Sequence, residues 1–360
     1  MYYLNLVSRA SRCFLSSINF VRSTTNARRN VHVYKGVFIK PLRFDTRIER
    51  YRFNDRDKRH ERRSRMLLAV PLPTLILNYF LGIDSDEEVP EVIMTIKRSV
   101  LLIQKGEYNK AEQMLHLALR QAQTIQHYDA ITYIYDVMAN LAFDTGKYRK
   151  AENLFVSVLQ RLMLNGAKED DIRVIHISLK MAKVFEHLNE PKKAEQGYKF
   201  CMENLKSHIG KDPDNKDAIL LQGMTFDWYA KMLLSQARYT EAFNYFLQAY
   251  DICKKMNGEE HEQTVVLLND LGTICCIRGE YDEAIKYLSA AAKIGENLPD
   301  MADLGSIHVN LGNVLLKKGL YDEAKKSCQR GRKIAKSRDD NDSLLEAIEC
   351  LKEVKRLLSL

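Results

Sequence analysis

Residue types and spacings that could support catalysis are rare in this 360-residue chain. Gly146-Lys147 lacks the upstream glycine that a phosphate-binding loop needs in order to wrap its backbone around a nucleotide. His261-Glu262 is followed by no histidine at the spacing of zinc proteases, and no G-x-S-x-G or G-x-G-x-x-G string occurs. The sequence therefore predicts a protein that is not an enzyme and binds no cofactor.

The histidines and cysteines do not group into a metal site. His308 is distant in sequence from His176 and His187, and those two are eleven positions apart, which favours packing or surface roles over metal ligation. Cys275 and Cys276 are adjacent, so on a helix their side chains diverge by about 100° and cannot form an ordinary disulfide. Because the seven cysteines include no C-x-x-C, we expect neither a disulfide framework nor a zinc site.

The elements that must position any functional side chain come from an internal repeat. A turn motif recurs six times: a small residue, an aromatic two positions later, and an alanine three positions after that. In the third copy Pro191 replaces the aromatic residue. The copies begin at Gly106, Gly146, Asn189, Ala237, Gly279 and Gly319. A period of 40 to 48 residues indicates a stack of helix pairs.

Each position of the repeat has a physical task. The first turn residue ends one helix in the left-handed conformation, the aromatic fills the space between the helices, and the alanine lets their backbones approach. Small residues seven positions before the turn permit close packing within the pair; they are Ala139, Ala182, Ala230, Gly272 and Gly312. Larger residues lie four positions after the alanine; they are Leu115, Phe155, Tyr198, Phe246, Leu288 and Cys328.

This pattern resembles the tetratricopeptide repeat. Leu271-Gly272 and Leu311-Gly312, each with a tyrosine nine residues after the glycine, match its signature. The long period is similar to the long-helix variant of kinesin light chains, and the turn motif argues against HEAT-type repeats. The resemblance implies an all-α, right-handed superhelix of about six helix pairs over residues 92–340, followed by an amphipathic capping helix over residues 341–360.

The resemblance also implies a groove lined by the first helix of each pair. Projected onto this chain, the groove positions are Asp136, Asn140, Lys183, Asp227, Lys231, Asn269, Thr273 and Asn313. Such a row suits an extended peptide, because amide side chains can pair with its backbone. A solvated helix face is the alternative. Asn140, Lys183 and Lys231 do not reproduce the full carboxylate clamp of chaperone-binding relatives, so a chaperone tail is a weak candidate ligand.

The N-terminal region differs from the rest in charge. Residues 1–65 hold 17 Lys/Arg against five Asp/Glu, and residues 1–44 contain no acid. An acid-free cationic stretch with apolar residues at helical spacing is typical of a mitochondrial presequence; a basic tail without a targeting role is the alternative. Residues 66–360 carry a net charge of −4, so the overall +8 does not indicate nucleic-acid binding.

An uncharged run, residues 66–83, precedes an acidic linker, residues 84–91. Eighteen residues just suffice to cross a bilayer at about 1.5 Å per residue, but Pro71 and Pro73 remove backbone donors that lipid cannot replace. We expect this run to associate with a membrane, by spanning it or by lying in its interface. Packing on the protein's own body is the alternative. If the run spans, its basic flank places the repeats outside the matrix.

Residues 130–143 and 261–267, together with this N-terminal layout, resemble a family of mitochondrial tetratricopeptide repeat proteins. Membership implies a matrix-facing location at the mitochondrial inner membrane and binding to respiratory complex III, including its Rieske iron–sulfur subunit. It also implies a role in clearing N-terminal fragments of that subunit. An outer-membrane import receptor and a cytosolic kinesin-like cargo adaptor remain as alternatives.

Overall fold

The computed structural model describes residues 91–299 and 301–359, which lie in the second of the chain's two units, 52–360. This part of the chain contains thirteen α-helices and no strand. The N-terminal segments predicted for targeting and membrane association lie outside the described residues, as does the acidic linker apart from residue 91. Within the described ranges, no helix is both long and apolar enough to cross a bilayer.

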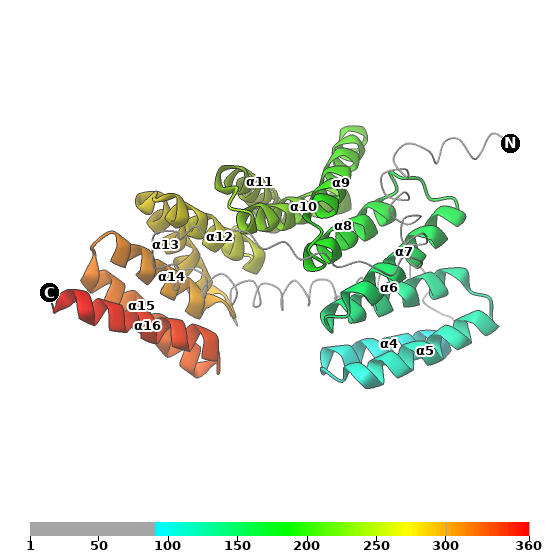
Figure 1. Ribbon diagram of the computed structural model, residues 1–360, viewed down its shortest axis with the longest axis horizontal. Helices are drawn as coiled ribbons and strands as arrows, with labels where there is room; N and C mark the ends of the chain where they lie inside the picture. The colour runs from blue at the N-terminus through cyan, green and yellow to red at the C-terminus, as the bar shows by residue number, and fades with distance from the viewer. Residues whose placement is uncertain (1–90, 300, 360) are drawn as a thin grey trace, which may run out of the picture. The chain divides into compact units, whose positions relative to one another are not determined.

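The helices follow one another as six pairs and a final single helix (Figure 1). The first three pairs are α4 (Glu91–Gln104) with α5 (Tyr108–Thr124), α6 (Tyr128–Asp144) with α7 (Tyr148–Leu164), and α8 (Ile172–His187) with α9 (Pro191–Lys211). The next three are α10 (Lys216–Ser235) with α11 (Tyr239–Asn257), α12 (Glu262–Arg278) with α13 (Tyr281–Asn297), and α14 (Leu304–Lys317) with α15 (Tyr321–Ser337). The last helix is α16 (Asn341–Leu358).

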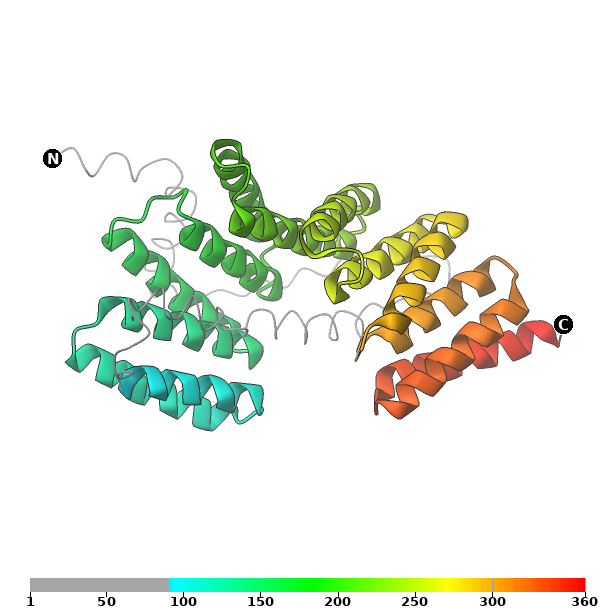
Figure 2. The same cartoon turned by 180° about the vertical axis from the view of Figure 1, so that it is seen from behind.

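Each helix packs against the next one along the chain, as the opposite views of Figures 1 and 2 also show. First helices of consecutive pairs also touch directly, α8 with α10 and α12 with α14. Such nearest-neighbour packing is the mark of a repeat array, in which no pair buries its apolar face alone. The predicted all-α fold of tetratricopeptide-type helix pairs is confirmed.

All six turn residues adopt the left-handed conformation predicted for them. Four are glycines, and the others are Asn189 with φ of 58° and Ala237 with φ of 59°. Asparagine visits this region more readily than other side chains, whereas the Cβ of an alanine is crowded there. Ala237 therefore holds a conformation that its neighbours in the fold impose on it.

The small residues of the repeat lie where the paired helices are closest. The six turn alanines are fully buried, as are Ala139, Ala182 and Ala230. A Cβ added to Gly272 would lie 2.5 Å from Cγ of Leu288, the residue four positions after its turn alanine. A Cβ on Gly312 would overlap Cys328 Sγ at the equivalent place in the next repeat. The two predicted sets of small and large residues thus pack against each other.

Side-chain caps fix the starts of several first helices. His127 and His261 accept hydrogen bonds from the backbone N–H groups of Ala130 and Gln263, at 3.2 and 3.1 Å. Asp171 and Asn215 cap α8 and α10 in the same way. A cap satisfies a backbone donor that has no partner within the helix. His261, which the sequence showed outside any zinc motif, has this structural role.

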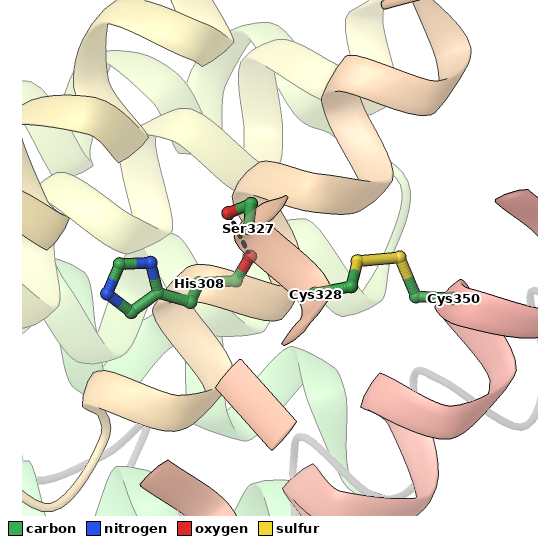
Figure 3. The surroundings of a disulfide bond; sticks show 4 residues. All are labelled: His308, Ser327, Cys328 and Cys350. Carbon is green, nitrogen blue, oxygen red and sulfur yellow. Dashed lines mark hydrogen bonds between the residues drawn. A yellow bond between two sulfur atoms is a disulfide. The ribbon is translucent and has the colours of Figure 1, made fainter. Parts of the chain in front are cut away.

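The last helix is joined covalently to the array. Cys328 of α15 and Cys350 of α16 form a disulfide with a Cα–Cα distance of 6.2 Å (Figure 3). Both residues are buried, and α16 packs on α15 and α14. The sequence indicated no disulfide framework and so did not predict this single bond, because only the packing of α16 brings together two residues that are 22 positions apart. Cys275 and Cys276 are free, as expected.

Candidate functional site

The predicted groove residues lie on the first helices α6, α8, α10, α12 and α14, and several bridge consecutive repeats. Asp136 of α6 forms an ion pair with Lys180 of α8, with Nζ and Oδ1 3.0 Å apart. Asn269 of α12 accepts a hydrogen bond from the amide of Asn310 in α14 at 2.7 Å. In both cases the acceptor residue lies three positions before the small residue of its own helix. Its partner lies two positions before the small residue of the next first helix.

A third bridge joins α10 to α12 through a lysine. The Lys231 ammonium lies 2.8 Å from Asp227 on its own helix and 3.6 Å from Asp270 of α12. Burial opposes the charged form of Lys231, but the two carboxylates outweigh it and raise the lysine pKa above its usual value. The three side chains therefore form one buried charged network.

The remaining predicted residues are placed differently. Asn140 is buried, and its Oδ1 atom has no hydrogen-bond partner among the described residues. Lys183 pairs with Glu186 one turn along α8, at 2.9 Å. Thr273 and Asn313 are half-buried on α12 and α14. Only part of the row thus forms contacts between consecutive first helices, and its role in peptide binding stays a prediction.

Three residues of these bridges were missed from the sequence. They are Lys180, Asp270 and Asn310, which are only 4%, 8% and 4% exposed. All three occupy the position two residues before the small residue of their helix, so the signal was present as a constant register of polar residues. The amphipathic pattern alone assigns this position to the buried face and gives no reason to expect a partner there.

A large cleft opens between the second, third and fourth helix pairs. Its volume is about 1240 Å³, and residues of α6, α7, α8, α9 and α10 line it together with the α7–α8 loop. The apolar part of the lining comes from α7, α8 and α10; it includes Val158, Leu162, Ile177, Leu221 and Met224.

Polar side chains of the cleft have unusual surroundings. Tyr133 is 4% exposed, and its hydroxyl has no hydrogen-bond partner in the described part of the chain. Burial and the nearby Asp136 carboxylate raise the pKa of Tyr133 well above its usual value, so the hydroxyl stays protonated. Burial, with a smaller effect from Lys180, lowers the pKa of His176 to about 3, which keeps this imidazole neutral.

The rim of the cleft is rich in carboxylates. Asp171 pairs with Arg173 at 2.7 Å and Asp170 with Lys211 at 3.4 Å. The hydrogen bond and charge of Arg173 hold the pKa of Asp171 below its ordinary value despite partial burial. Asp129 and Asp217, in the first turns of α6 and α10, are exposed and make no ion pair within the described ranges. Two carboxylates of the rim are therefore available to a ligand.

Ser327 and His308 are neighbours but do not form a nucleophile–base pair. Ser327 donates its hydroxyl to the backbone carbonyl of His308, not to the imidazole, as Figure 3 shows. The imidazole Nε2 of His308 lies 3.1 Å from Glu296 instead. No three potential metal ligands cluster within the residues that the structure describes. The cleft lining itself presents hydrogen-bonding, charged and apolar side chains.

A row of helix pairs, each with a left-handed turn followed by a buried alanine, defines a tetratricopeptide repeat protein. Family models described as tetratricopeptide repeat match residues 221–297 and residues 305–338. Among solved structures, BtubC (BKLC) from P. vanneervenii superposes with a TM-score of 0.52 at 18% identity, covering 70% of this chain and 93% of that one. Aspartyl phosphate phosphatase F from Bacillus subtilis superposes with a TM-score of 0.53 at 16% identity, covering 89% and 86%. Both share the fold.

Sequence comparison is more specific. The Drosophila melanogaster tetratricopeptide repeat protein 19 homolog, mitochondrial, is 39% identical over 285 residues, which are 79% of this chain and 77% of the fly protein. The Homo sapiens tetratricopeptide repeat protein 19, mitochondrial, is 35% identical over 282 residues, covering 76% and 74%. The chain belongs to the family of mitochondrial tetratricopeptide repeat protein 19.

Proposed function

We propose that this protein is a non-enzymatic scaffold of the mitochondrial inner membrane that binds respiratory complex III. In this role it holds N-terminal fragments of the Rieske iron–sulfur subunit and aids their removal from the complex. The observation that carries the proposal is the 39% identity to a mitochondrial relative over 79% of the chain. The repeats would face the matrix, where the subunit's processing fragments are handled.

The structure supports a holding role through the groove and the cleft. A helix-pair array offers an extended surface on which a peptide can lie in one direction. The bridges between first helices, such as Lys180 with Asp136, fix the spacing of that surface from repeat to repeat. A fragment bound there needs no covalent step.

Affinity purification from mitochondria tests the partner. The tagged protein should capture complex III subunits from solubilised inner membranes, and a null mutant should accumulate Rieske N-terminal fragments on the complex. Unchanged fragment levels in the null mutant would refute the clearance role. Association with outer-membrane or cytosolic partners instead would favour an import receptor or a cargo adaptor.

A combined variant tests the predicted groove row. Asn140→Ala, Lys183→Ala and Asn313→Ala together remove side chains from three first helices, α6, α8 and α14. We expect weaker capture of complex III by a variant whose helical circular dichroism and unfolding midpoint show that it remains folded. Unchanged capture by a folded triple variant would show that the partner binds elsewhere.

A further inference from the structure

We propose that the cleft between α6, α8 and α10 binds an extended peptide segment in which apolar side chains alternate with lysine or arginine. The inference rests on the proposed handling of peptide fragments and names the kind of segment that fits. Four features of the cleft carry it, namely its size, its apolar lining, its charge and an unpartnered buried hydroxyl.

The size of the cleft suits a peptide. Its volume of about 1240 Å³ exceeds the roughly 300 to 1000 Å³ of typical small-molecule pockets. It runs across three consecutive first helices, which is the direction in which a chain can lie along a repeat array. A segment of several residues can therefore occupy it.

The apolar lining provides contact area for alternate side chains. Val158 and Leu162 of α7 face the cleft from one helix pair, and Leu221 and Met224 of α10 from another. Leu220, also in the lining, is 40% exposed in the free protein. In an extended segment every second side chain points the same way, so one set can bury against these residues.

The charge of the lining favours lysine or arginine at the remaining side chains of the bound segment. Among the described residues, the cleft lining contains five aspartates, one lysine (Lys168) and one arginine (Arg173). Asp136, Asp170 and Asp171 have cationic partners, whereas Asp129 and Asp217 make no ion pair in the described ranges. They lie on α6 and α10, on either side of α8 along the array. Cationic side chains of the bound segment would reach them, whereas a polyanion such as a nucleic acid would be repelled.

Tyr133 supplies a second, independent indication of a ligand. Its side chain lines the cleft at 4% exposure, yet its hydroxyl has no hydrogen-bond partner among the described residues. The hydroxyl oxygen is itself enclosed, so a ligand group reaches it only when a neighbouring side chain of the lining shifts, and it then gains a hydrogen bond that the free protein lacks. A peptide carries backbone donors and acceptors at every residue, which a purely apolar occupant does not.

Direct binding to the full-length protein tests the proposal. The probe is a fluorescein-labelled ten-residue peptide of alternating leucine and lysine, and the control peptide has glutamate at each lysine. Fluorescence anisotropy should show saturable binding of the lysine peptide, weakened by added salt because the rim charges are exposed. Equal affinity for the two peptides, or no binding of either, would overturn the proposal.

Variants locate the binding. The double variant Asp129→Asn with Asp217→Asn should bind the lysine peptide about tenfold more weakly, the effect of losing two charge contacts. The matched control is Asp322→Asn with Glu323→Gln, which removes two first-turn acids of α15, far along the chain from the cleft. Its affinity should equal that of the wild type, and a similar loss in the control would place the peptide elsewhere.

Two further variants exclude misfolding as the cause of weaker peptide binding, one by a gain of affinity and one by a conservative change. Lys168→Glu exchanges an exposed cation of the lining for an anion, so it should bind the lysine peptide more tightly. Tyr133→Phe keeps the ring and removes only the hydroxyl, and should weaken binding without changing the salt dependence. If neither variant alters the affinity, the cleft is not the binding site.

The result is separable from the proposed function. A wild-type protein that binds the lysine peptide but captures no complex III subunit would refute the scaffold role and leave the cleft as a peptide site. Capture of complex III that persists in the Asp129→Asn/Asp217→Asn variant, with peptide binding lost, supports both. Capture without any peptide binding would overturn only the assignment of the cleft.

Discussion

Lys180 of α8 places its ammonium 3.0 Å from the Asp136 carboxylate of α6, so a buried ion pair joins two consecutive first helices. Their side chains are 5% and 14% exposed, and both carboxylate oxygens accept from the ammonium. A charge so enclosed is stable only with its partner, because removal of either side chain leaves the other desolvated and alone. The pair therefore fixes how the third helix pair sits on the second.

Lys180→Met should destabilise the protein by about 3 kcal/mol, because it leaves the Asp136 carboxylate buried without a cation. Lys180→Met with Asp136→Leu should recover much of this loss, since two apolar side chains replace the pair. Urea unfolding monitored by circular dichroism measures both variants. The control is Lys286→Met, whose ion pair with Glu283 is exposed, and an equal loss there would contradict the argument.

The turn conformations could be predicted from the sequence, whereas the bridges between repeats could not. Each turn depends on its own few residues, so Gly279 and Asn189 indicate a left-handed end without reference to the rest of the fold. The contact between Asn310 and Asn269 depends on the stagger between α12 and α14, which arises only when the pairs stack. A pattern within one helix contains no information about that stagger.

Ala237→Gly should stabilise the protein by about 0.5 to 1 kcal/mol. Alanine at φ of 59° carries the Cβ crowding of the left-handed region, and glycine does not, although its greater freedom in the unfolded chain offsets part of the gain. The midpoint of urea unfolding should therefore rise. Gly279→Ala makes the opposite change at the equivalent turn and should lower it, and a shift of the same sign in both variants would disprove the strain at Ala237.

The cleft residues show the same limit of sequence reasoning. Asp136 was predicted as a groove residue from its position in the repeat, and it lines the cleft. Asp129, Asp217 and Tyr133 were not, because each is ordinary within its own helix: the aspartates suit a helix start and the tyrosine suits a buried face. Only the meeting of α6, α8 and α10 makes them neighbours of one space.

Reduction of the Cys328–Cys350 disulfide should loosen the C-terminal end of the array. The bond closes a segment of 22 residues, for which loss of the cross-link costs about 3 kcal/mol. Cys350→Ala should therefore lower the unfolding midpoint to that of the wild type in dithiothreitol, and the variant itself should not respond to the reductant. Cys253→Ala removes a free buried cysteine, so this control should keep the response to the reductant. Mass spectrometry after alkylation under denaturing conditions would detect the pair, and alkylation of both cysteines without prior reduction would contradict the bond.

Acid should destabilise the protein partly through His176. Its pKa is lowered to about 3 in the folded state, first by burial and then by Lys180, against an ordinary value near 6.5 in the unfolded chain. Between these two values the unfolded chain holds a proton that the folded protein does not, so stability falls as the pH falls through this window. Above about pH 6.5 the imidazole is neutral in both states, so His176 no longer lowers the stability of the folded protein.

His176→Gln should therefore make the stability depend less steeply on pH. Glutamine does not titrate, so the proton that His176 takes up on unfolding is removed, and the slope of unfolding free energy against pH between 6.5 and 5 should be shallower than in the wild type. Met224→Leu changes a neighbouring residue of the cleft without a titrating group and should keep the wild-type slope. In the wild type, the nuclear magnetic resonance signal of the His176 ring should not shift between pH 8 and 5. Two results would contradict this account: a ring that titrates near pH 6.5, or an unchanged slope in the glutamine variant. Either would show that the cleft does not hold this imidazole neutral, because only a group with different proton affinities in the two states links folding to pH.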